Sequence, residues 1–365
     1  WQTAFDKLPN PNENDFPQVG IASTPCALGD RLWYVNNRAE VVCADAENGN
    51  PVWRYDMIKE LGVFPDQASS CSPVIGGDLV FVVTGNGASQ ADQKLPAPKA
   101  PSFIALDKKT GKLAWQSNLP GDKVAEGQWG NAAYAVVNGK GQAVFPGGDG
   151  YLYGFEAETG KLLWKFNCVP KQAKPSGGQP MPRYLVATPV LWENKAYIGI
   201  GRQPDLASGM EGHFWCIDMT KTGDISPAED NKGPGVVWHF GGPAKQKGVR
   251  KYVFGPTISS CAIHDGLAYV SELDGYLHCL DARTGQEYWQ HDLKAAVWAA
   301  PLVADGKIYL GDDNGDLMIF PVGKEKKEAD VRTIDMGKAV KSPVIAANGV
   351  LYVQTDTVLY AIGKK

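Results

Sequence analysis

Two loops of this 365-residue chain are basic and contain no acidic residue. They span residues 168–187 and 241–254, in a chain whose 40 acidic residues outnumber its 36 basic ones. Basic side chains that gather on one surface attract anions, because the positive potential there concentrates them. With one neighbouring arginine, these loops predict an anionic-ligand site formed by Lys171, Lys174, Arg183, Arg202, Lys245, Lys247, Arg250 and Lys251. The alternative is that these side chains are simply solvated.

Aromatic residues flank the same loops. We expect Trp129, Tyr184 and Tyr252 to stack on a planar ligand in this site, since aromatic rings offer flat apolar surfaces. Phe254 and Trp298 lie close by in the sequence and have the same capacity. Packing inside the protein is the alternative role for each of these rings.

No pattern of residues predicts a catalytic residue or a metal ligand. The histidines His213, His239, His264, His278 and His291 lack the spacing of a metal-binding pair, and the sequence offers His278 no partner. Residues 312–316 read Asp-Asp-Asn-Gly-Asp, which resembles a calcium loop but lacks its distal bidentate glutamate, so we expect a turn there.

Serine and cysteine residues give no stronger signal. The pairs at residues 69–70 and 259–260 are expected to line a central channel, but no nucleophile motif surrounds them. The seven cysteines include no adjacent pair and no C-x-x-C, which excludes haem attachment and the common zinc patterns. We expect buried structural thiols, and leave open whether Cys26 and Cys71 approach each other.

The composition narrows the partners and the location. A net charge of −4 argues against nucleic-acid binding, which usually needs a strongly basic domain. No apolar run approaches the ~18 residues of a transmembrane helix. Trp1 is a suitable first residue after removal of a signal peptide, so we expect an exported monomer in the periplasm or at the cell surface.

A repeated unit must position all of these side chains. At residues 43–53, 105–115, 154–164 and 279–289, an acidic residue is followed by Gly after four positions and by Trp after eight. A degenerate fifth copy starts at Cys216 and has a late Trp238. Repetition at roughly fifty to sixty residues indicates a propeller or a solenoid.

Each repeat contains four short β-rich runs separated by turn residues, the pattern of one propeller blade. We therefore predict an all-β fold, a single-domain seven-bladed β-propeller of four-stranded antiparallel blades. The blades are expected near residues 21–56, 69–118, 130–167, 186–240, 255–293, 297–336 and 340–365. The docking residues Trp53, Trp115, Trp164 and Trp289 should be buried between blades in equivalent positions.

The last unit stops before its outer strand. Residues 1–6, Trp-Gln-Thr-Ala-Phe-Asp, resemble the outer strands that contain Trp53 and Trp115. We expect them to complete the last blade, with Trp1 as a further docking residue, and so to close the ring without an exposed edge. The alternatives are an eight-bladed ring with one unrecognised blade, and a chain cut from a longer protein.

The two rims of such a ring differ. Connections between strands one and two and between strands three and four share one rim, where nearly all are tight turns; we name it the short-loop rim. The opposite, long-loop rim holds the insertions at residues 56–70, 85–101, 119–130, 168–187, 201–212 and 241–255. Long loops are often functional, so we expect binding at the long-loop rim.

The unit Ala-x-Asp-x-x-Thr-Gly-x-x-x-Trp is similar to the tryptophan-docking repeat of the PQQ-like β-propellers. That superfamily contains quinoprotein alcohol dehydrogenases, a non-catalytic propeller lipoprotein of outer-membrane β-barrel assembly, and exported bacterial propellers of unassigned activity. The dehydrogenases hold PQQ between adjacent cysteines and a tryptophan, beside a calcium ion and a catalytic aspartate. This sequence has no adjacent cysteines and matches none of the other positions, so we expect no cofactor, with PQQ and calcium as the alternative.

Three functions stay open. The first is a non-catalytic exported scaffold that presents its long-loop rim to a protein, peptide or glycan partner. The second is a PQQ-dependent or other quinone-dependent dehydrogenase-like redox enzyme. The third is a hydrolase or lyase whose active site is assembled across blades at the rim.

Overall fold

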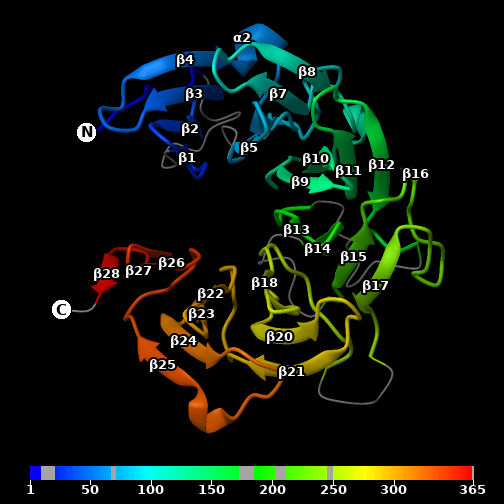
Figure 1. Ribbon diagram of the computed structural model, residues 1–365, viewed down its shortest axis with the longest axis vertical. Helices are drawn as coiled ribbons and strands as arrows, with labels where there is room; N and C mark the ends of the chain where they lie inside the picture. The colour runs from blue at the N-terminus through cyan, green and yellow to red at the C-terminus, as the bar shows by residue number, and fades with distance from the viewer. Residues whose placement is uncertain are drawn as a thin grey trace.

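The computed structural model describes residues 1–9, 21–66, 71–89, 91–171, 185–201, 210–244 and 250–363. Within these ranges, seven separate β-sheets follow one another along the chain and stand around a common axis (Figure 1). Each sheet is one blade. Blades 1 to 3 contain β1 (Cys26–Leu28), β2 (Arg31–Val35), β3 (Glu40–Asp45), β4 (Pro51–Asp56), β5 (Val74–Gly76), β6 (Leu79–Val83), β7 (Phe103–Asp107), β8 (Leu113–Ser117), β9 (Ala133–Val137), β10 (Lys140–Pro146), β11 (Tyr151–Glu156) and β12 (Leu162–Asn167).

The second half of the chain repeats this arrangement. Blades 4 to 7 contain β13 (Val190–Trp192), β14 (Lys195–Ile200), β15 (His213–Asp218), β17 (Val236–Gly241), β18 (Ala262–His264), β19 (Leu267–Ser271), β20 (Tyr276–Asp281), β21 (Glu287–Asp292), β22 (Leu302–Ala304), β23 (Lys307–Gly311), β24 (Asp316–Pro321), β25 (Arg332–Asp335), β26 (Ile345–Ala347), β27 (Val350–Gln354) and β28 (Leu359–Gly363). Short helices lie in the connections: α2 (Met57–Leu61), η2 (Gly121–Lys123) and η4 (Glu328–Asp330). The predicted all-β propeller is confirmed.

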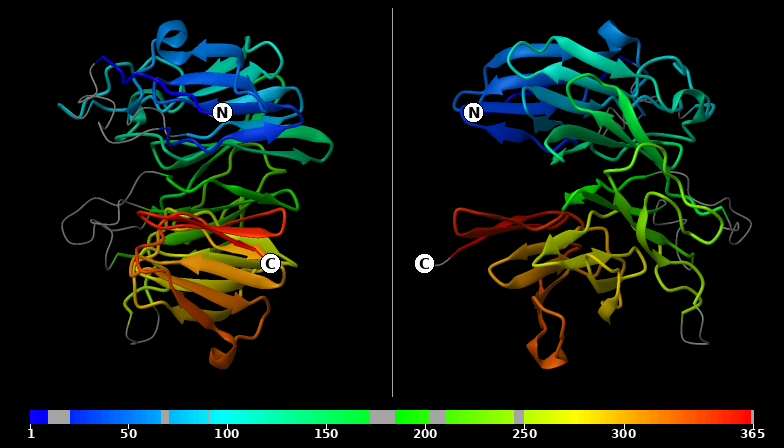
Figure 2. Two further views of the ribbon diagram at one scale, coloured as in Figure 1. Left: turned by 90° about the vertical axis from the view of Figure 1, so that its left-hand side faces the viewer. Right: turned by 45° about the vertical axis from the view of Figure 1, so that its right-hand side comes forward.

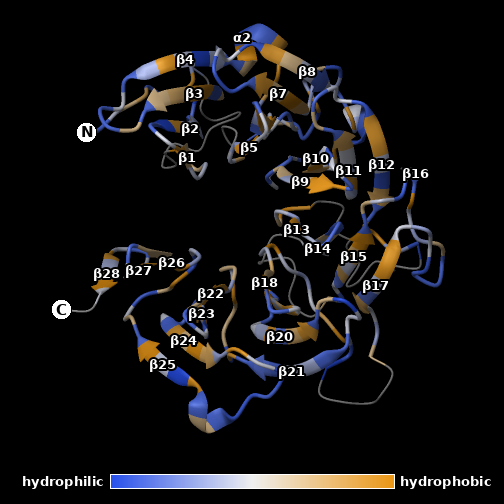
Figure 3. Ribbon diagram, in the orientation of Figure 1, coloured by the Kyte–Doolittle hydropathy of each residue, from blue (hydrophilic) through white to orange (hydrophobic). Residues whose placement is uncertain are grey.

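The hydrophobic core lies between the blades. Blades 2 and 3, for example, share one cluster in which Phe103 and Phe145 stack at 4.8 Å between ring centroids. Similar clusters join each blade to the next, from blades 1 and 2 through to blades 6 and 7. The strands carry the apolar residues of these interfaces, whereas the connections are mainly hydrophilic (Figure 3).

A β-bulge recurs at one position of the repeat. In blades 1 to 5 the register between the third and fourth strands shifts immediately after the residue that pairs with the docking tryptophan, as at Ala105, which pairs with Trp115. A bulge increases local twist and re-aims side chains. We infer that it turns each tryptophan out of its own sheet and toward the next blade.

The indole ring rests on the repeat glycine of the following blade. A Cβ atom added to Gly111 would lie 2.6 Å from Trp53 Cδ2, and one added to Gly160 would lie 2.6 Å from Trp115 Cδ2. These glycines also have φ values of 72° and 70°. Glycine is therefore required twice, for the left-handed turn and for the contact with the ring.

In three of the four regular repeats the indole N–H also bonds to the following blade. Trp53 Nε1 donates to Lys108 O at 3.1 Å and Trp115 Nε1 to Ala157 O at 2.7 Å, in both cases the residue after the repeat acid. Trp289 donates to Gly323 O at 2.9 Å. These three residues therefore bond to the following blade, although Trp53 is only partly buried; a docking role in equivalent positions stays a prediction.

Trp164 departs from this equivalence. It is fully buried, and its Nε1 donates to Gln142 Oε1 at 2.9 Å instead of to the next blade. Gln142 Nε2 then donates to Met219 O at 3.1 Å. Met219 O, the carbonyl that follows the repeat acid Asp218, is therefore linked to Trp164 through the Gln142 side chain and not directly. This turn of blade 4 is enlarged by an insertion.

That insertion explains the late Trp238 of the degenerate fifth copy. Residues 219–235 leave blade 4 and place β16 (Gly223–Asp224) in parallel beside β12 of blade 3. Trp238 nevertheless donates to Ala282 O at 3.0 Å and packs on Gly285, like the regular docking residues. Residues 322–331 of blade 6 form a second insertion, so the short-loop rim has two longer connections that the sequence analysis missed.

A belt of polar bonds links the starts of the inner strands. Thr24 N donates to Ser72 Oγ at 2.9 Å, Asn131 Nδ2 donates to Thr188 Oγ1 at 2.9 Å, and Ser260 Oγ donates to Thr188 O at 3.0 Å. The hydroxyls predicted to line the channel therefore connect blades, at least at residues 259–260; residues 69–70 lie outside the description. Asp312 forms the expected turn, since its Oδ1 accepts from three following backbone N–H groups.

The N-terminal segment docks on blade 1 but is not part of blade 7. Trp1 Nε1 donates to Ala46 O at 3.0 Å, and its ring packs on Gly49, as the other docking residues do in their blades. Phe5 lies against Tyr34 on the same side of blade 1. However, Trp1 is 59% exposed, β28 pairs only with β27 within the described chain, and blades 1 and 7 stand apart (Figures 1 and 2). Closure of the ring stays a prediction.

Closure has a defined register. Ala361 pairs with Tyr352 as Cys43 pairs with Trp33, so Trp1 should pair with Ala361 and Thr3 with Leu359. In a Cys26→Ser background, Thr3→Cys with Leu359→Cys should form an intramolecular disulfide, detected by mass spectrometry after mild oxidation. Thr3→Cys with Ile345→Cys, two strands away in blade 7, is the control. Equal cross-linking of the two pairs would contradict this register.

Candidate functional site

Two hydrogen-bonded arms, residues 241–244 and 250–255, connect blades 4 and 5 at the long-loop rim (Figure 1). The arms are joined where Val253 N donates to Gly242 O and Ala244 N to Lys251 O, both at 2.9 Å. We name residues 241–255 the rim hairpin; its tip, residues 245–249, lies outside the description. This is the second of the two basic loops predicted to bind an anion.

Arg250 fixes the base of the rim hairpin to blade 5. Its guanidinium donates two hydrogen bonds to Glu272, at 2.7 Å and 2.6 Å, in a bidentate pair. The same group lies between two aromatic rings, 4.5 Å from the centroid of Tyr252 and 4.0 Å from that of Tyr276. Planarity and fixed donors suit arginine, and not lysine, to this combination.

Glu272 is fully buried because the hairpin closes over it. It lies in the tight turn between β19 and β20, and its Oε2 also accepts a bond from Gly255 N. A Cβ atom at Gly255 would lie 2.1 Å from that oxygen, so no other residue allows this approach. Tyr252 donates its hydroxyl to Asp274 of the same turn.

His278 extends the network into the interface between blades 4 and 5. Its Nε2 bonds Glu272 Oε1 and its Nδ1 bonds Glu287 Oε1, both at 2.7 Å. The side chain is inaccessible, with Phe240 and Phe254 edge-on to the ring, both at 5.4 Å. The sequence analysis found no partner for His278; the two glutamates correct that reading.

These contacts shift the pKa values in the network. Burial alone would lower the pKa of His278, but its hydrogen bonds to the carboxylates of Glu272 and Glu287 raise it above the ordinary histidine value. Burial would raise the pKa of Glu272, whereas His278 and Arg250 hold it below the usual range. Arg250, His278, Glu272 and Glu287 therefore form one hydrogen-bonded network where blade 4, blade 5 and the rim hairpin meet.

The structure thus gives Arg250 and Tyr252 partners inside the protein. Their hydrogen-bonding groups serve the anchoring of the rim hairpin, and the predicted anion site depends on the remaining lysines and arginines. Lys171 and Lys251 are exposed, and Trp129 lies in a different region, at the entry to β9 of blade 3. The predicted site residues outside the description are Lys174, Arg183, Tyr184, Arg202, Lys245 and Lys247. A shared anionic-ligand cleft stays a prediction.

A second histidine cluster lies at the same rim of blade 4. His213 Nδ1 and His239 Nε2 are 3.0 Å apart, and Glu211 Oε1 lies 3.6 Å from His213 Nε2. Burial and the neighbouring His213 lower the pKa of His239 to about 3. Sequence spacing could not reveal this pair, because the two residues are 26 positions apart and meet only when β15 pairs with β17.

The expectation that the chain binds no quinone cofactor stays a prediction. Among the described residues no cluster of three or more His, Cys, Asp and Glu side chains is placed to hold a metal ion. Arg250 is held by Glu272. The seven cysteines are free thiols, and burial raises the pKa of Cys71 to about 12, consistent with structural roles. No described helix has the length and hydropathy to cross a membrane.

Comparisons with known proteins agree with the fold. Quinohemoprotein alcohol dehydrogenase ADH IIB of Pseudomonas putida is 28% identical over 197 residues, which cover 50% of this chain and 25% of that enzyme. Outer membrane protein assembly factor BamB of Yersinia pestis is 22% identical over 343 residues, covering 88% of this chain and 76% of the relative. The chain therefore spans only about a quarter of the dehydrogenase.

A solved structure and a family model give matches to BamB as well. The crystal structure of BamB from Moraxella catarrhalis superimposes with a TM-score of 0.57 at 17% identity, covering 90% of this chain and 79% of that one. The family model described as "Outer membrane protein assembly factor BamB" matches residues 1–223 and 221–323. Because these segments make up most of the sequence, the chain belongs to this family of PQQ-like repeat propellers.

Proposed function

We propose that this propeller is a non-catalytic scaffold of the cell envelope that binds a protein partner through its long-loop rim. The observation that carries the proposal is the anchoring of the rim hairpin by the buried network of Arg250, Glu272 and His278. Removing charged groups from water is costly, and a buried ionic network often serves conformational specificity more than stability. In this protein the network fixes the orientation of the rim hairpin relative to blades 4 and 5.

The chemistry of the presented segment favours an acidic partner surface. Residues 244–251 contain Lys245, Lys247 and Lys251 and no acidic residue. Charged groups at a protein interface steer association and fix orientation more than they add affinity. The relatives whose names describe assembly of outer-membrane proteins support a protein partner in preference to a glycan.

Site-specific photo-cross-linking tests the proposal. The exposed Lys251 on the rim hairpin is replaced by a photoreactive amino acid, and the exposed Lys161 in a tight turn of the short-loop rim is the matched control. Expressed in the envelope of a bacterium that encodes this chain, the Lys251 variant should form one discrete protein adduct, identified by mass spectrometry. The Lys161 variant should not form it.

Two outcomes would overturn the proposal. Equal adducts from both rims, or none from the long-loop rim, would remove the support for a rim-bound protein partner. Quinone absorbance that stays with the purified chain after incubation with PQQ and calcium, together with alcohol oxidation, would favour the redox alternative instead.

A further inference from the structure

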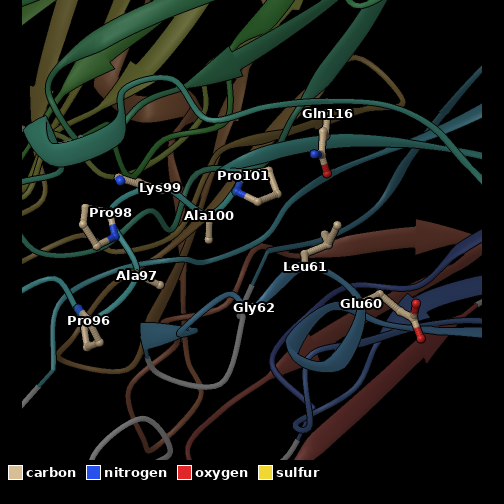
Figure 4. A pocket seen from close by; sticks show the side chains of 10 residues that line it. All are labelled: Glu60, Leu61, Gly62, Pro96, Ala97, Pro98, Lys99, Ala100, Pro101 and Gln116. Carbon is tan, nitrogen blue, oxygen red and sulfur yellow. The ribbon is translucent and has the colours of Figure 1, made fainter.

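A groove of about 610 Å³ opens on the long-loop rim between blades 1 and 2, far along the ring from the rim hairpin (Figure 4). One wall is the end of α2, with Glu60 and Leu61, and the other is the loop between β6 and β7, with Pro96, Pro98 and Pro101. Leu61 also packs against the core of blades 1 and 2. The volume falls in the range of about 300–1,000 Å³ that is usual for binding sites.

Both walls are held rigidly. Asp56 caps the start of α2 by accepting from Lys59 N, and Gly62 ends the helix in the left-handed conformation. On the other side, Asn86 Nδ2 donates to Ala97 O and Thr84 Oγ1 to Pro101 O, both at 2.9 Å. A wall that is already ordered loses little conformational entropy on binding, which favours recognition by this surface.

We name the loop with Pro96, Pro98 and Pro101 the proline wall. Its sequence resembles a proline-rich peptide that other proteins bind, but its conformation differs from that of such a peptide. Residues 98–101 read Pro-Lys-Ala-Pro, the spacing that docks as a polyproline II helix in aromatic grooves. Here Ala100 N donates to Ala97 O at 3.1 Å, so the segment turns and cannot extend in that way. Pro101 is buried, and the accessible rings of Pro96 and Pro98 give this wall apolar surface against which an aromatic side chain can pack.

The charge of Lys99 favours a ligand that has a carboxylate next to its aromatic group. Lys99 is exposed on the proline wall, and no ion pair joins it to a carboxylate of the described chain. Glu60, on the opposite wall, points away from Lys99 (Figure 4) and lies 3.9 Å from Lys59. A carboxylate in the occupant therefore finds an available cation on the proline side, in agreement with the basic tip of the rim hairpin.

We infer that this groove binds an extended segment of the partner protein in which an aromatic side chain is followed by a carboxylate. The inference rests on the proposed function and names a second contact for the same partner. The aromatic group supplies the main apolar contact, since aromatic residues are enriched among those that dominate interface energies. Lys99 supplies orientation and preference for the acidic neighbour.

Fluorescence anisotropy with three labelled twelve-residue peptides in a Gly-Ser background tests the inference. The peptides contain Tyr-Glu, Tyr-Lys or Ala-Glu at the centre. At low salt the Tyr-Glu peptide should bind at least about tenfold more tightly than either of the others, and its affinity should fall as salt rises. Lys99→Glu should reverse the preference between Tyr-Glu and Tyr-Lys.

Lys109→Glu, an exposed charge reversal in a turn of the short-loop rim, is the control and should leave the preference unchanged. Equal binding of all three peptides, or a preference that Lys99→Glu does not alter, would overturn the inference. A photoreactive residue at position 99 separates it from the proposed function. Adducts from position 251 without adducts from position 99 would support the proposed function and contradict the inference about the groove. The absence of adducts from both positions would contradict both proposals.

Discussion

Replacing Glu272 with alanine is expected to lower the free energy of unfolding by about 3–5 kcal/mol, the usual range when one partner of a buried ion pair is removed. Glu272 is fully buried and accepts hydrogen bonds from Arg250, His278 and Gly255 N. Its loss would leave the Arg250 guanidinium and the His278 imidazole without their shared carboxylate in a site closed to water. Urea denaturation monitored by tryptophan fluorescence measures the change.

The chain provides a matched control in Glu193→Ala. Arg283 also binds its glutamate through two nitrogens, at 3.2 Å and 2.6 Å, and stacks on Trp192. The difference is exposure, since the Arg283 and Glu193 side chains are 57% and 41% accessible. We expect this variant to lose less than about 1 kcal/mol. Similar losses in the two variants would show that the buried network does not anchor the rim hairpin.

Trp115→Ala should cost about 3–5 kcal/mol, because it empties a well-packed site and removes the bond to Ala157 O. The ring is 8% exposed and stacks on Phe155 of the next blade at 5.6 Å between centroids. Leu113→Ala, on the same strand but 38% exposed, is the control for loss of an apolar side chain from β8. Thermal and urea unfolding of the three proteins measures the effect.

The receiving side of this contact gives an independent check. Gly160 and Gly139 both have positive φ values, 70° and 81°, and both belong to blade 3. An added Cβ at Gly160 meets Trp115, whereas nothing lies within 4 Å of one at Gly139. Gly160→Ala should therefore cost about 1–3 kcal/mol more than Gly139→Ala. Equal costs would mean that backbone strain alone, and not docking, requires the glycine.

The sequence revealed those parts of the fold that depend on local spacing. The acid, glycine and tryptophan of one repeat lie within nine residues, so their pattern predicts the hairpin and the docking ring together. The same rule holds where the spacing fails: Trp238 is delayed by the insertion that forms β16, yet it reaches the same carbonyl position in blade 5. The tertiary contact, and not the spacing, is what the repeat maintains.

The network beneath the rim hairpin could not be predicted in this way. Arg250 and Glu272 are 22 residues apart. The turn that contains Glu272 recurs in other blades, but Gly147 and Asp312 stand at the matching position in blades 3 and 6, so the repeat does not predict this pair. From its neighbours in the sequence alone, Arg250 is expected to be a solvated basic residue in a loop. Only the approach of Gly255 to the turn between β19 and β20 closes the site and converts a free cation into half of a buried pair.

The insertion in blade 4 also has a consequence for self-association. By lying beside β12, β16 covers the outer edge of blade 3, where Lys165 and Asp224 form an ion pair at 3.1 Å. The outermost strands of blades 1, 2, 4, 5 and 6 have no such cover within the described residues. Unpaired edges are templates for strands of other molecules. Aggregation of this protein at high concentration should therefore begin at one of these blades and spare the third.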